Sequence, residues 1–164
     1  MGKVGLTYHD YSNLIDEALV KLFKNNLTFD GVYGLPRGGL PIAVHISHHL
    51  NIPMIMNLIQ FSQEHSDGKL LVVDDIVDTG KTFDRLIEVS EIQKIDFFSL
   101  TLYYKPQSTY KPDIFVKETQ SWIVFPWEPY DERPSEYHQD VYSDLFKSET
   151  VIQQSKLEED SNDN

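Results

Sequence analysis

Short apolar runs alternate with amphipathic helical segments along the first 125 residues, and this alternation restricts the fold more than any other feature. The run Leu70–Val73 is apolar throughout and rich in valine, which is typical of a strand buried in a parallel sheet. Helices are expected at residues 10–25, 38–50 and 81–93, and further strands at 31–35, 54–59, 96–104, 114–116 and 122–125. The pattern predicts an α/β fold with a parallel sheet flanked by helices.

In a sheet of this kind, ligands bind beyond the carboxyl ends of the strands. The loops that follow Leu35, Val73, Tyr104 and Phe125 would all lie at that edge. A functional site is therefore expected among these four loops.

The most informative stretch follows the apolar run and reads Asp-Asp-Ile-Val-Asp-Thr-Gly-Lys-Thr, residues 74–82. It is not a nucleotide-binding P-loop, because Asp75 stands where that motif requires its first glycine. The glycines at 31, 34, 38 and 39 do not have the dinucleotide-binding spacing either. In a P-loop, a carboxylate in place of the glycine would face the phosphates. Both nucleotide-binding motifs are therefore excluded, one by Asp75 and the other by the glycine spacing.

The same stretch has the chemistry of a sugar-phosphate site. Backbone N–H groups at a helix N-terminus, with the hydroxyls of Thr79 and Thr82, suit a phosphate monoester. The adjacent carboxylates Asp74 and Asp75 suit vicinal sugar hydroxyls or a magnesium ion. A ribose 5-phosphate would satisfy both parts, whereas the simpler alternative is a solvated acidic turn with a helix cap.

This stretch closely resembles the phosphoribosyl pyrophosphate (PRPP) signature of type I phosphoribosyltransferases. The resemblance implies that Asp74 and Asp75 hold the ribose 2- and 3-hydroxyls and that the turn holds the 5-phosphate. The turn residues are Asp78, Thr79, Gly80, Lys81 and Thr82. It also implies a small hood built from the terminal segments beside the parallel sheet.

An earlier loop, Gly34-Leu-Pro-Arg-Gly-Gly-Leu40, lies one strand–helix–strand unit before the signature and resembles the family's pyrophosphate loop. Gly38 and Gly39 would let backbone amides approach an anion, and Arg37 would offer a fork of donors. In the family this loop often carries a cis peptide bond, which here would be Pro36–Arg37. Together the two loops predict a PRPP site.

The acceptor is expected downstream, where Lys105-Pro106 and Trp122-Ile-Val-Phe-Pro-Trp-Glu128 resemble bacterial xanthine–guanine phosphoribosyltransferases. By that resemblance Lys105 donates to the 6-oxo group of a purine, Trp122 stacks on the base and Ile123 presents backbone groups to its edge. An exposed indole face supplies stacking of about 1–3 kcal/mol. Glu128 would help to hold the magnesium-bound pyrophosphate through water.

The implied reaction transfers the 5-phosphoribosyl group of PRPP to a 6-oxopurine, which makes the chain a pentosyltransferase of purine salvage. Asp78 would accept the purine's proton or hydrogen-bond its N7, and Arg37 would stabilise the leaving pyrophosphate. The implied cofactor is Mg²⁺, with Asp74, Asp75 and Glu128 as its expected contacts. The three clustered carboxylates are expected to raise one another's pKa.

The chain departs from the family at residues 60–69, which are short for the mobile lid that covers PRPP in the relatives. The segment after Tyr130 also lacks an obvious counterpart. We expect one phosphoribosyltransferase-like domain over residues 1–147, with a helix at 134–146, and an acidic, flexible tail over residues 148–164.

Charge is concentrated near the C-terminus. The net charge is −12, and eleven acidic but only three basic residues lie between Glu128 and Asn164. Such a surface repels phosphate backbones, which argues against nucleic-acid binding. The sequence has no cysteine and no membrane-length apolar run, so we expect a cytoplasmic protein without membrane partners. Family resemblance implies a homodimer or homotetramer.

Two other functions fit the same residues. The chain could be a non-catalytic or weakly catalytic sensor of PRPP or nucleotide, which the short 60–69 segment favours and the intact Asp78, Arg37 and Lys105 oppose. It could also use adenine or a pyrimidine as acceptor, although Lys105 and Trp122 favour a 6-oxopurine. The sequence leaves the choice among xanthine, guanine and hypoxanthine open.

Overall fold

The computed structural model of the chain describes residues 2–128. The chain divides into two compact units, residues 1–126 and residues 127–164, and each is described by itself. Trp127 and Glu128 are the described residues of the second unit. All the helices and strands of the described residues belong to the first unit. Within residues 2–128, every helix is too short or too polar to cross a bilayer. The predicted helix 134–146, the domain end at residue 147 and the tail 148–164 lie outside the described residues.

The main sheet is parallel, as the alternating pattern predicts. Its strands are β2 (Gly31–Gly34), β3 (Lys69–Val77), β4 (Asp96–Tyr104) and β5 (Ile114–Glu118), arranged in the order β2-β3-β4-β5. The register places Val73 beside Leu100 and Leu100 beside Ile114. Because all four strands run in the same direction, their carboxyl ends lie at one edge.

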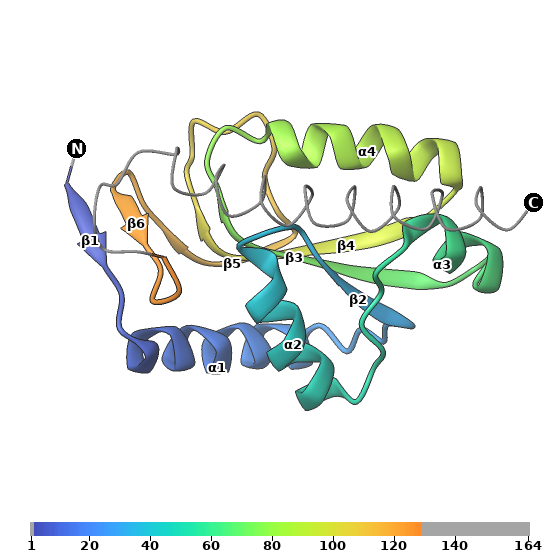
Figure 1. Ribbon diagram of the computed structural model, residues 1–164, viewed down its shortest axis with the longest axis horizontal. Coiled ribbons are helices and arrows are strands. Elements are labelled where there is room, and N and C mark those ends of the chain that lie inside the picture. Colours follow the sequence, from blue (N-terminus) through green and yellow to red (C-terminus); the bar gives the residue numbers. More distant parts are fainter. Residues whose placement is uncertain (1, 129–164) are drawn as a thin grey trace, which may run out of the picture. The chain divides into compact units, whose positions relative to one another are not determined.

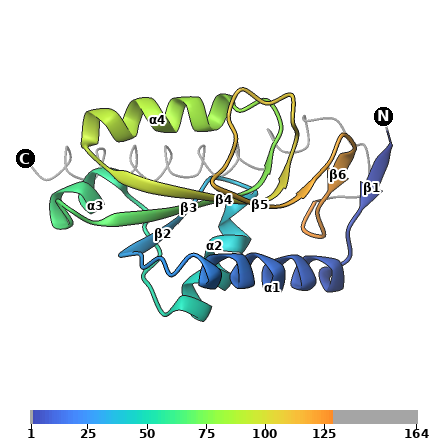
Figure 2. The same ribbon diagram turned by 180° about the vertical axis from the view of Figure 1, so that it is seen from behind.

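Helices cover both faces of this sheet. Helices α1 (Tyr8–Lys24) and α2 (Gly39–Leu50) lie on one face, and α4 (Lys81–Gln93) lies on the other (Figures 1 and 2). The short helix α3 (Leu58–Glu64) contacts α4. Alternate side chains of β3 are buried on opposite faces, so Leu70 and Val72 join the core beneath α3 and α4.

Helix α1 begins two residues earlier than the sequence analysis predicts. Thr7 and Asp10 form a capping box, in which the Thr7 hydroxyl accepts from the Asp10 N–H and the Asp10 carboxylate accepts from the Thr7 N–H. Asp10 is thus the third helical residue. The buried stripe that includes Leu14 and Ala18 then holds α1 against the sheet.

The predicted strand at residues 54–59 is wrong. Met54 makes an isolated bridge with Val32, and the chain then enters α3. The Asn57 side chain accepts hydrogen bonds from the N–H groups of Ile59 and Gln60, which starts a helix where a short apolar run suggested a strand. Phe61, 2% exposed, fixes that helix in the core.

A second, two-stranded parallel sheet pairs β1 (Lys3–Gly5) with β6 (Trp122–Val124). It lies beyond the carboxyl ends of β3 and β4 (Figures 1 and 2). This sheet is the described part of the predicted hood, and the N-terminal segment contributes to it. Strand β1 was not anticipated, because three exposed residues carry no readable apolar pattern.

Candidate active site

The acid pair lies inside a strand rather than after one. Strand β3 continues through Asp74 and Asp75 to Val77, although the sequence analysis ends it at Val73. The Asp75 N–H donates to Asp74 Oδ1 at 3.0 Å, and the Ile76 N–H donates to Asp75 Oδ1 at 2.7 Å. Burial, and then the negative charge of Asp75, raise the pKa of Asp74 well above its usual range. A bound cation, or a hydroxyl group that donates a hydrogen bond, would lower the cost of ionising Asp74.

The turn that follows β3, residues 78–82 and hereafter the β3–α4 turn, leads directly into α4. Gly80 is the N-cap of α4 and has φ of +89°, a left-handed conformation that favours glycine. Thr79, Lys81 and Thr82 are exposed. A glycine N-cap has no side chain to occupy the first helical N–H groups, so the turn can present them to an anion.

Three of the residues expected to bind a base come together beside this turn. The Lys105 side chain is 4% exposed, and its Nζ forms an ion pair with Asp78 Oδ1 at 3.0 Å. The same Nζ lies 5.7 Å from the centroid of the Trp122 ring. Trp122 is 58% exposed, so its indole surface is accessible to a flat ligand. The residues that directly follow β3 and β4, together with the first residue of β6, thus form one polar and aromatic corner.

The neighbouring Ile123 has a buried side chain, and its backbone is the part that could contact a ligand. The Trp122 N–H donates to the Gly2 carbonyl, and the Leu6 N–H donates to the Val124 carbonyl, so these groups face β1. Backbone groups of successive strand residues point to opposite sides. The N–H and C=O of Ile123 therefore point away from β1.

The loop after β2, residues 35–38 and hereafter the β2–α2 loop, contains the cis peptide bond Pro36–Arg37 that the family resemblance implies. Arg37 is exposed. The Asp75 carboxylate lies against Gly38, where an added Cβ would collide with it. The loop and the acid pair are thus brought into direct contact, as a shared ligand site would require.

Gly39 has a different role from the one predicted for both glycines. Its N–H donates to the Leu35 carbonyl at 2.9 Å and is therefore engaged within the chain. A Cβ at this position would collide with the Val73 carbonyl oxygen. Gly39 allows α2 to pack closely on the end of β3, while the N–H groups of Arg37 and Gly38 are the candidates for an anion.

Asp74 and Asp75 fit a magnesium ion that is bound partly by the protein and partly by its substrate. Magnesium in proteins is often held by one or two carboxylates, with substrate phosphates and water completing its shell. Asp74 and Asp75 provide such a pair. Residues 2–128 contain no group of three potential metal ligands. Glu128, the third expected contact, belongs to the second unit.

The sequence analysis missed the segment that joins β4 to β5, residues 106–113, which we call the strap. The Thr109 N–H and hydroxyl both donate to the Thr79 carbonyl oxygen, at 3.1 and 3.0 Å. The Tyr110 ring stacks on Phe83 of α4 with centroids 4.4 Å apart. An aromatic residue within an otherwise polar connection was the one signal that this segment docks on the molecule.

Residues 60–69, expected to be short for a lid, form the second half of α3 and the turn before β3. Phe61 is buried and stacks on His65, with ring centroids 4.8 Å apart. The Gln60 amide also donates to Glu64 at 2.8 Å. Phe61 is the one residue of this segment that is buried, and it fixes the segment to the core beneath α4, while half of the segment is exposed.

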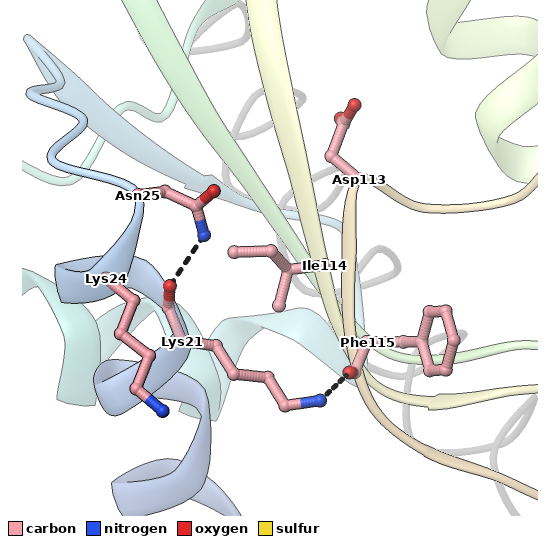
Figure 3. A pocket seen from close by; sticks show the side chains of 6 residues that line it. All are labelled: Lys21, Lys24, Asn25, Asp113, Ile114 and Phe115. Carbon is pink, nitrogen blue, oxygen red and sulfur yellow. Dashed lines mark hydrogen bonds between the residues drawn. The ribbon is translucent and has the colours of Figure 1, made fainter.

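A shallow pocket of about 290 Å³ lies elsewhere, between the end of α1 and the start of β5 (Figure 3). The Lys21 ammonium donates to the Phe115 carbonyl at 2.8 Å, and the Asn25 amide donates to the Lys21 carbonyl (Figure 3). Ile114 is the first residue of β5, so this pocket is at the amino edge of the sheet. None of the predicted site residues lines it.

Comparisons with known proteins agree with this geometry. The family model described as "Phosphoribosyl transferase domain" matches residues 59–133. A xanthine-guanine phosphoribosyltransferase of Idiomarina loihiensis is 34% identical over 119 residues, which cover 61% of this chain and 71% of the relative. Its counterpart in Chromohalobacter salexigens is 33% identical over 116 residues, which cover 61% and 69%.

Solved structures give the same fold. The crystal structure of a purine phosphoribosyltransferase from Pyrococcus horikoshii is 29% identical, with a TM-score of 0.68 over 81% of this chain and 98% of that one. A Helicobacter pylori xanthine-guanine-hypoxanthine phosphoribosyltransferase, 21% identical, has a TM-score of 0.65 over 77% and 94%. The latter likeness concerns the fold alone.

Proposed function

Because the chain belongs to the phosphoribosyltransferase family, whose members are pentosyltransferases, we propose that it transfers the phosphoribosyl group of PRPP to a 6-oxopurine. The product would be a nucleoside 5-monophosphate, and the role would be purine salvage. The observation that carries the proposal is the corner formed by Asp78, Lys105 and Trp122. It offers a cation, an acceptor and an aromatic face to one flat, polar ligand.

The acceptor specificity rests on Lys105. A buried ammonium has three donors and no acceptor, so it suits a carbonyl oxygen and not an amino group at the purine 6-position. While one N–H remains with Asp78, another can donate to the 6-oxo group. Trp122 would stack on the ring, and the outward backbone groups of Ile123 would meet its edge.

The donor would lie along the two loops. Asp74 and Asp75 would accept hydrogen bonds from the ribose hydroxyls, and the β3–α4 turn, Asp78 to Thr82, would bind the 5-phosphate through its N–H groups. Arg37 and the Gly38 N–H would bind the pyrophosphate. Gly38 contacts the Asp75 carboxylate, so this loop lies next to the proposed ribose site. All of these groups come from the same edge of the sheet.

In the reaction, a purine ring nitrogen forms a bond to C1 of the ribose while the bond from C1 to the pyrophosphate oxygen breaks. The electron pair of that bond leaves with the pyrophosphate, where Arg37 stabilises the charge. Asp78 accepts the proton that the purine nitrogen loses, or holds N7. Asp74 and Asp75 would hold a magnesium ion together with substrate oxygens, and that ion would further neutralise the charge of the pyrophosphate.

The ion pair with Lys105 bears on the role of Asp78. The ammonium 3.0 Å away fixes the orientation of the Asp78 carboxylate. Asp78 is therefore suited to accept a hydrogen bond from the purine and the proton when the base becomes cationic. We also propose, from the family resemblance, a cytoplasmic homodimer or homotetramer.

The test is an assay of pyrophosphate release with PRPP, Mg²⁺ and hypoxanthine, guanine, xanthine or adenine in turn. We expect turnover with at least one 6-oxopurine and none with adenine. Turnover with adenine alone would contradict the assigned role of Lys105. Binding of PRPP without pyrophosphate release with any base would favour a nucleotide or PRPP sensor instead.

A variant separates the base site from the rest. Trp122→Ala should raise the KM for the purine about tenfold, as expected for the loss of one base–aromatic stack, while the KM for PRPP stays unchanged. Phe23→Ala is the matched control, since Phe23 is an aromatic residue of α1 that is 62% exposed. An unchanged purine KM in Trp122→Ala would remove Trp122 from the base site.

A further inference from the structure

The strap, residues 106–113, crosses one side of the β3–α4 turn. Two donors of Thr109, its N–H and its hydroxyl, converge on the carbonyl oxygen of Thr79 at 3.1 and 3.0 Å. The hydroxyl is also 2.9 Å from Asp84 Oδ2, so its single proton is shared between two acceptors. These contacts join segments thirty residues apart in the sequence.

The carbonyl that Thr109 holds is part of the peptide unit that contains the Gly80 N–H. This peptide unit is trans and planar, so its carbonyl oxygen and its N–H point in opposite directions. Because the strap fixes the carbonyl toward itself, the Gly80 N–H points away from the strap. The strap therefore sets the direction of a donor that the proposed 5-phosphate site needs.

Without such a contact, this peptide unit could reverse. Gly80 occupies a left-handed conformation at φ of +89°. Glycine adopts left-handed and right-handed backbone conformations at similar free energy. A rotation of the Thr79–Gly80 peptide would replace the N–H by a carbonyl oxygen, which repels a phosphate. Because Gly80 permits this reversal, the turn needs an outside restraint to keep the N–H directed at an anion.

The strap also closes the side of the turn on which it lies. A Cβ added to Gly80 would collide with the Thr109 hydroxyl and would lie 2.7 Å from both Ser108 Oγ and the Tyr110 N–H nitrogen. The Gly80 Cα is therefore in close contact with the strap. The strap therefore blocks the approach of a phosphate from its own side, and the Gly80 N–H points to the opposite side.

The strap is itself fixed on both sides of Thr109. The Ser108 N–H donates to the carbonyl of Lys105, the residue that pairs with Asp78. Beyond Thr109, the Tyr110 ring stacks on Phe83 and its hydroxyl donates to Ser99 Oγ at 2.8 Å. The restraint on Thr79 is therefore connected to the core and to the proposed base site.

We propose that Thr109 is a positioning residue, which holds the Thr79–Gly80 peptide with its N–H directed at the 5-phosphate of the phosphoribosyl donor. This inference rests on the proposed function, because that function identifies the ligand of the turn. Thr109 itself touches no reacting atom. Its removal should therefore weaken binding of the sugar phosphate and leave purine binding unchanged.

The experiment compares Thr109→Val, which removes the hydroxyl but keeps the N–H bond, with Thr109→Ser, which keeps both. Ribose 5-phosphate is the probe, and its dissociation constant is measured by calorimetry on the full chain. We expect Thr109→Val to weaken binding about two- to tenfold, the effect of one lost hydrogen bond, and Thr109→Ser to bind like the wild type. Thr28→Val, at an exposed threonine between α1 and β2, is the matched control.

The KM values give a second readout. In Thr109→Val the KM for PRPP should rise by a similar factor, while the purine KM and the melting temperature stay unchanged. Unchanged ribose 5-phosphate binding in Thr109→Val, or no binding by the wild type, would overturn the role of Thr109. Wild-type binding of ribose 5-phosphate without nucleotide synthesis would instead contradict the proposed function alone.

Discussion

The two loops proposed to bind phosphates obtain their shapes in different ways. The β2–α2 loop is held by the strand beside it: Leu35 donates to the Val73 carbonyl at 2.9 Å, and Gly38 and Gly39 contact Asp75 and Val73. The β3–α4 turn is held by the strap, through Thr109. One loop is therefore built into the sheet, whereas the other depends on a separate connection.

The glycines of the two loops therefore have different structural roles. In the β2–α2 loop, glycine provides space, because a side chain would collide with β3. In the β3–α4 turn, glycine also provides a left-handed backbone conformation. Substitutions of the glycines on the β2–α2 side should therefore affect stability through packing, whereas substitutions around the β3–α4 turn should affect ligand binding and turnover.

The largest effect should come from the acidic residue that opens the β3–α4 turn. We expect Asp78→Asn to lower kcat about 100-fold, because it removes the acceptor of the purine's proton, while the KM for PRPP changes little. The measurement is steady-state kinetics with both substrates varied. Glu88→Gln, at an exposed position of α4, is the control. Equal losses in kcat and in PRPP affinity would contradict the acid–base role.

The next effect concerns stability and the β2–α2 side. Gly39→Ala should lower the free energy of unfolding by about 1–3 kcal/mol, because its Cβ would collide with the backbone oxygen of Val73. Urea denaturation measures the change. Gly2→Ala is the control, since a Cβ there would lie 3.7 Å from the Ser121 hydroxyl in ordinary contact. A Gly39→Ala protein as stable as the wild type would show that α2 can shift away from β3.

Much of the fold could be predicted from the sequence, because the signal was local. Helix 81–93 and strand 96–104 have the predicted bounds, since each carries a periodic pattern between clear turn residues. Strand 54–59 failed because one side-chain cap, at Asn57, changed a short apolar run into a helix start. A short apolar run does not by itself separate a strand from the start of a helix.

The site was predictable to the same extent. The motif residues Asp78 and Lys105 are adjacent in space, as the family resemblance implies, and the cis peptide lies at Pro36–Arg37. The contact between Thr109 and Thr79 was not predictable, because it joins two polar loops and no periodicity records it. The different use of Gly39 was also hidden, since packing against Val73 depends on how α2 meets the sheet.

Arg37, in the β2–α2 loop, should give a smaller effect than Asp78 or Gly39, and on ligand binding instead of stability. Arg37→Gln should raise the KM for PRPP about tenfold, the effect of losing a charge-assisted hydrogen bond, and leave the free energy of unfolding unchanged. Arg37 is exposed, so its side chain is available to a ligand. Arg85→Gln on α4, also exposed, serves as the control. A loss of stability in Arg37→Gln would mean that the arginine, like Gly39, supports the loop.

The smallest effect concerns Asp74, which lies beside Asp75 between the two loops. Burial and the charge of Asp75 raise the pKa of Asp74 above the model-peptide value of 3.8, so ionisation of this group costs the folded state more than the unfolded state. Its contribution to stability therefore falls as the pH rises from about 3.8 through the folded pKa. At pH 7, Asp74→Asn should have a higher free energy of unfolding than the wild type, and the difference should shrink as the pH is lowered.

Urea denaturation of both proteins between about pH 4 and pH 8 measures this difference. Asp67→Asn, at an exposed turn position, should show no such pH dependence. The same Asp74→Asn protein should lose the rise in melting temperature that Mg²⁺ and PRPP give the wild type, because ligand binding stabilises the folded state. If Asp74→Asn were less stable than the wild type at pH 7, the carboxylate would be a structural support of β3 and not a strained ligand for the sugar or metal.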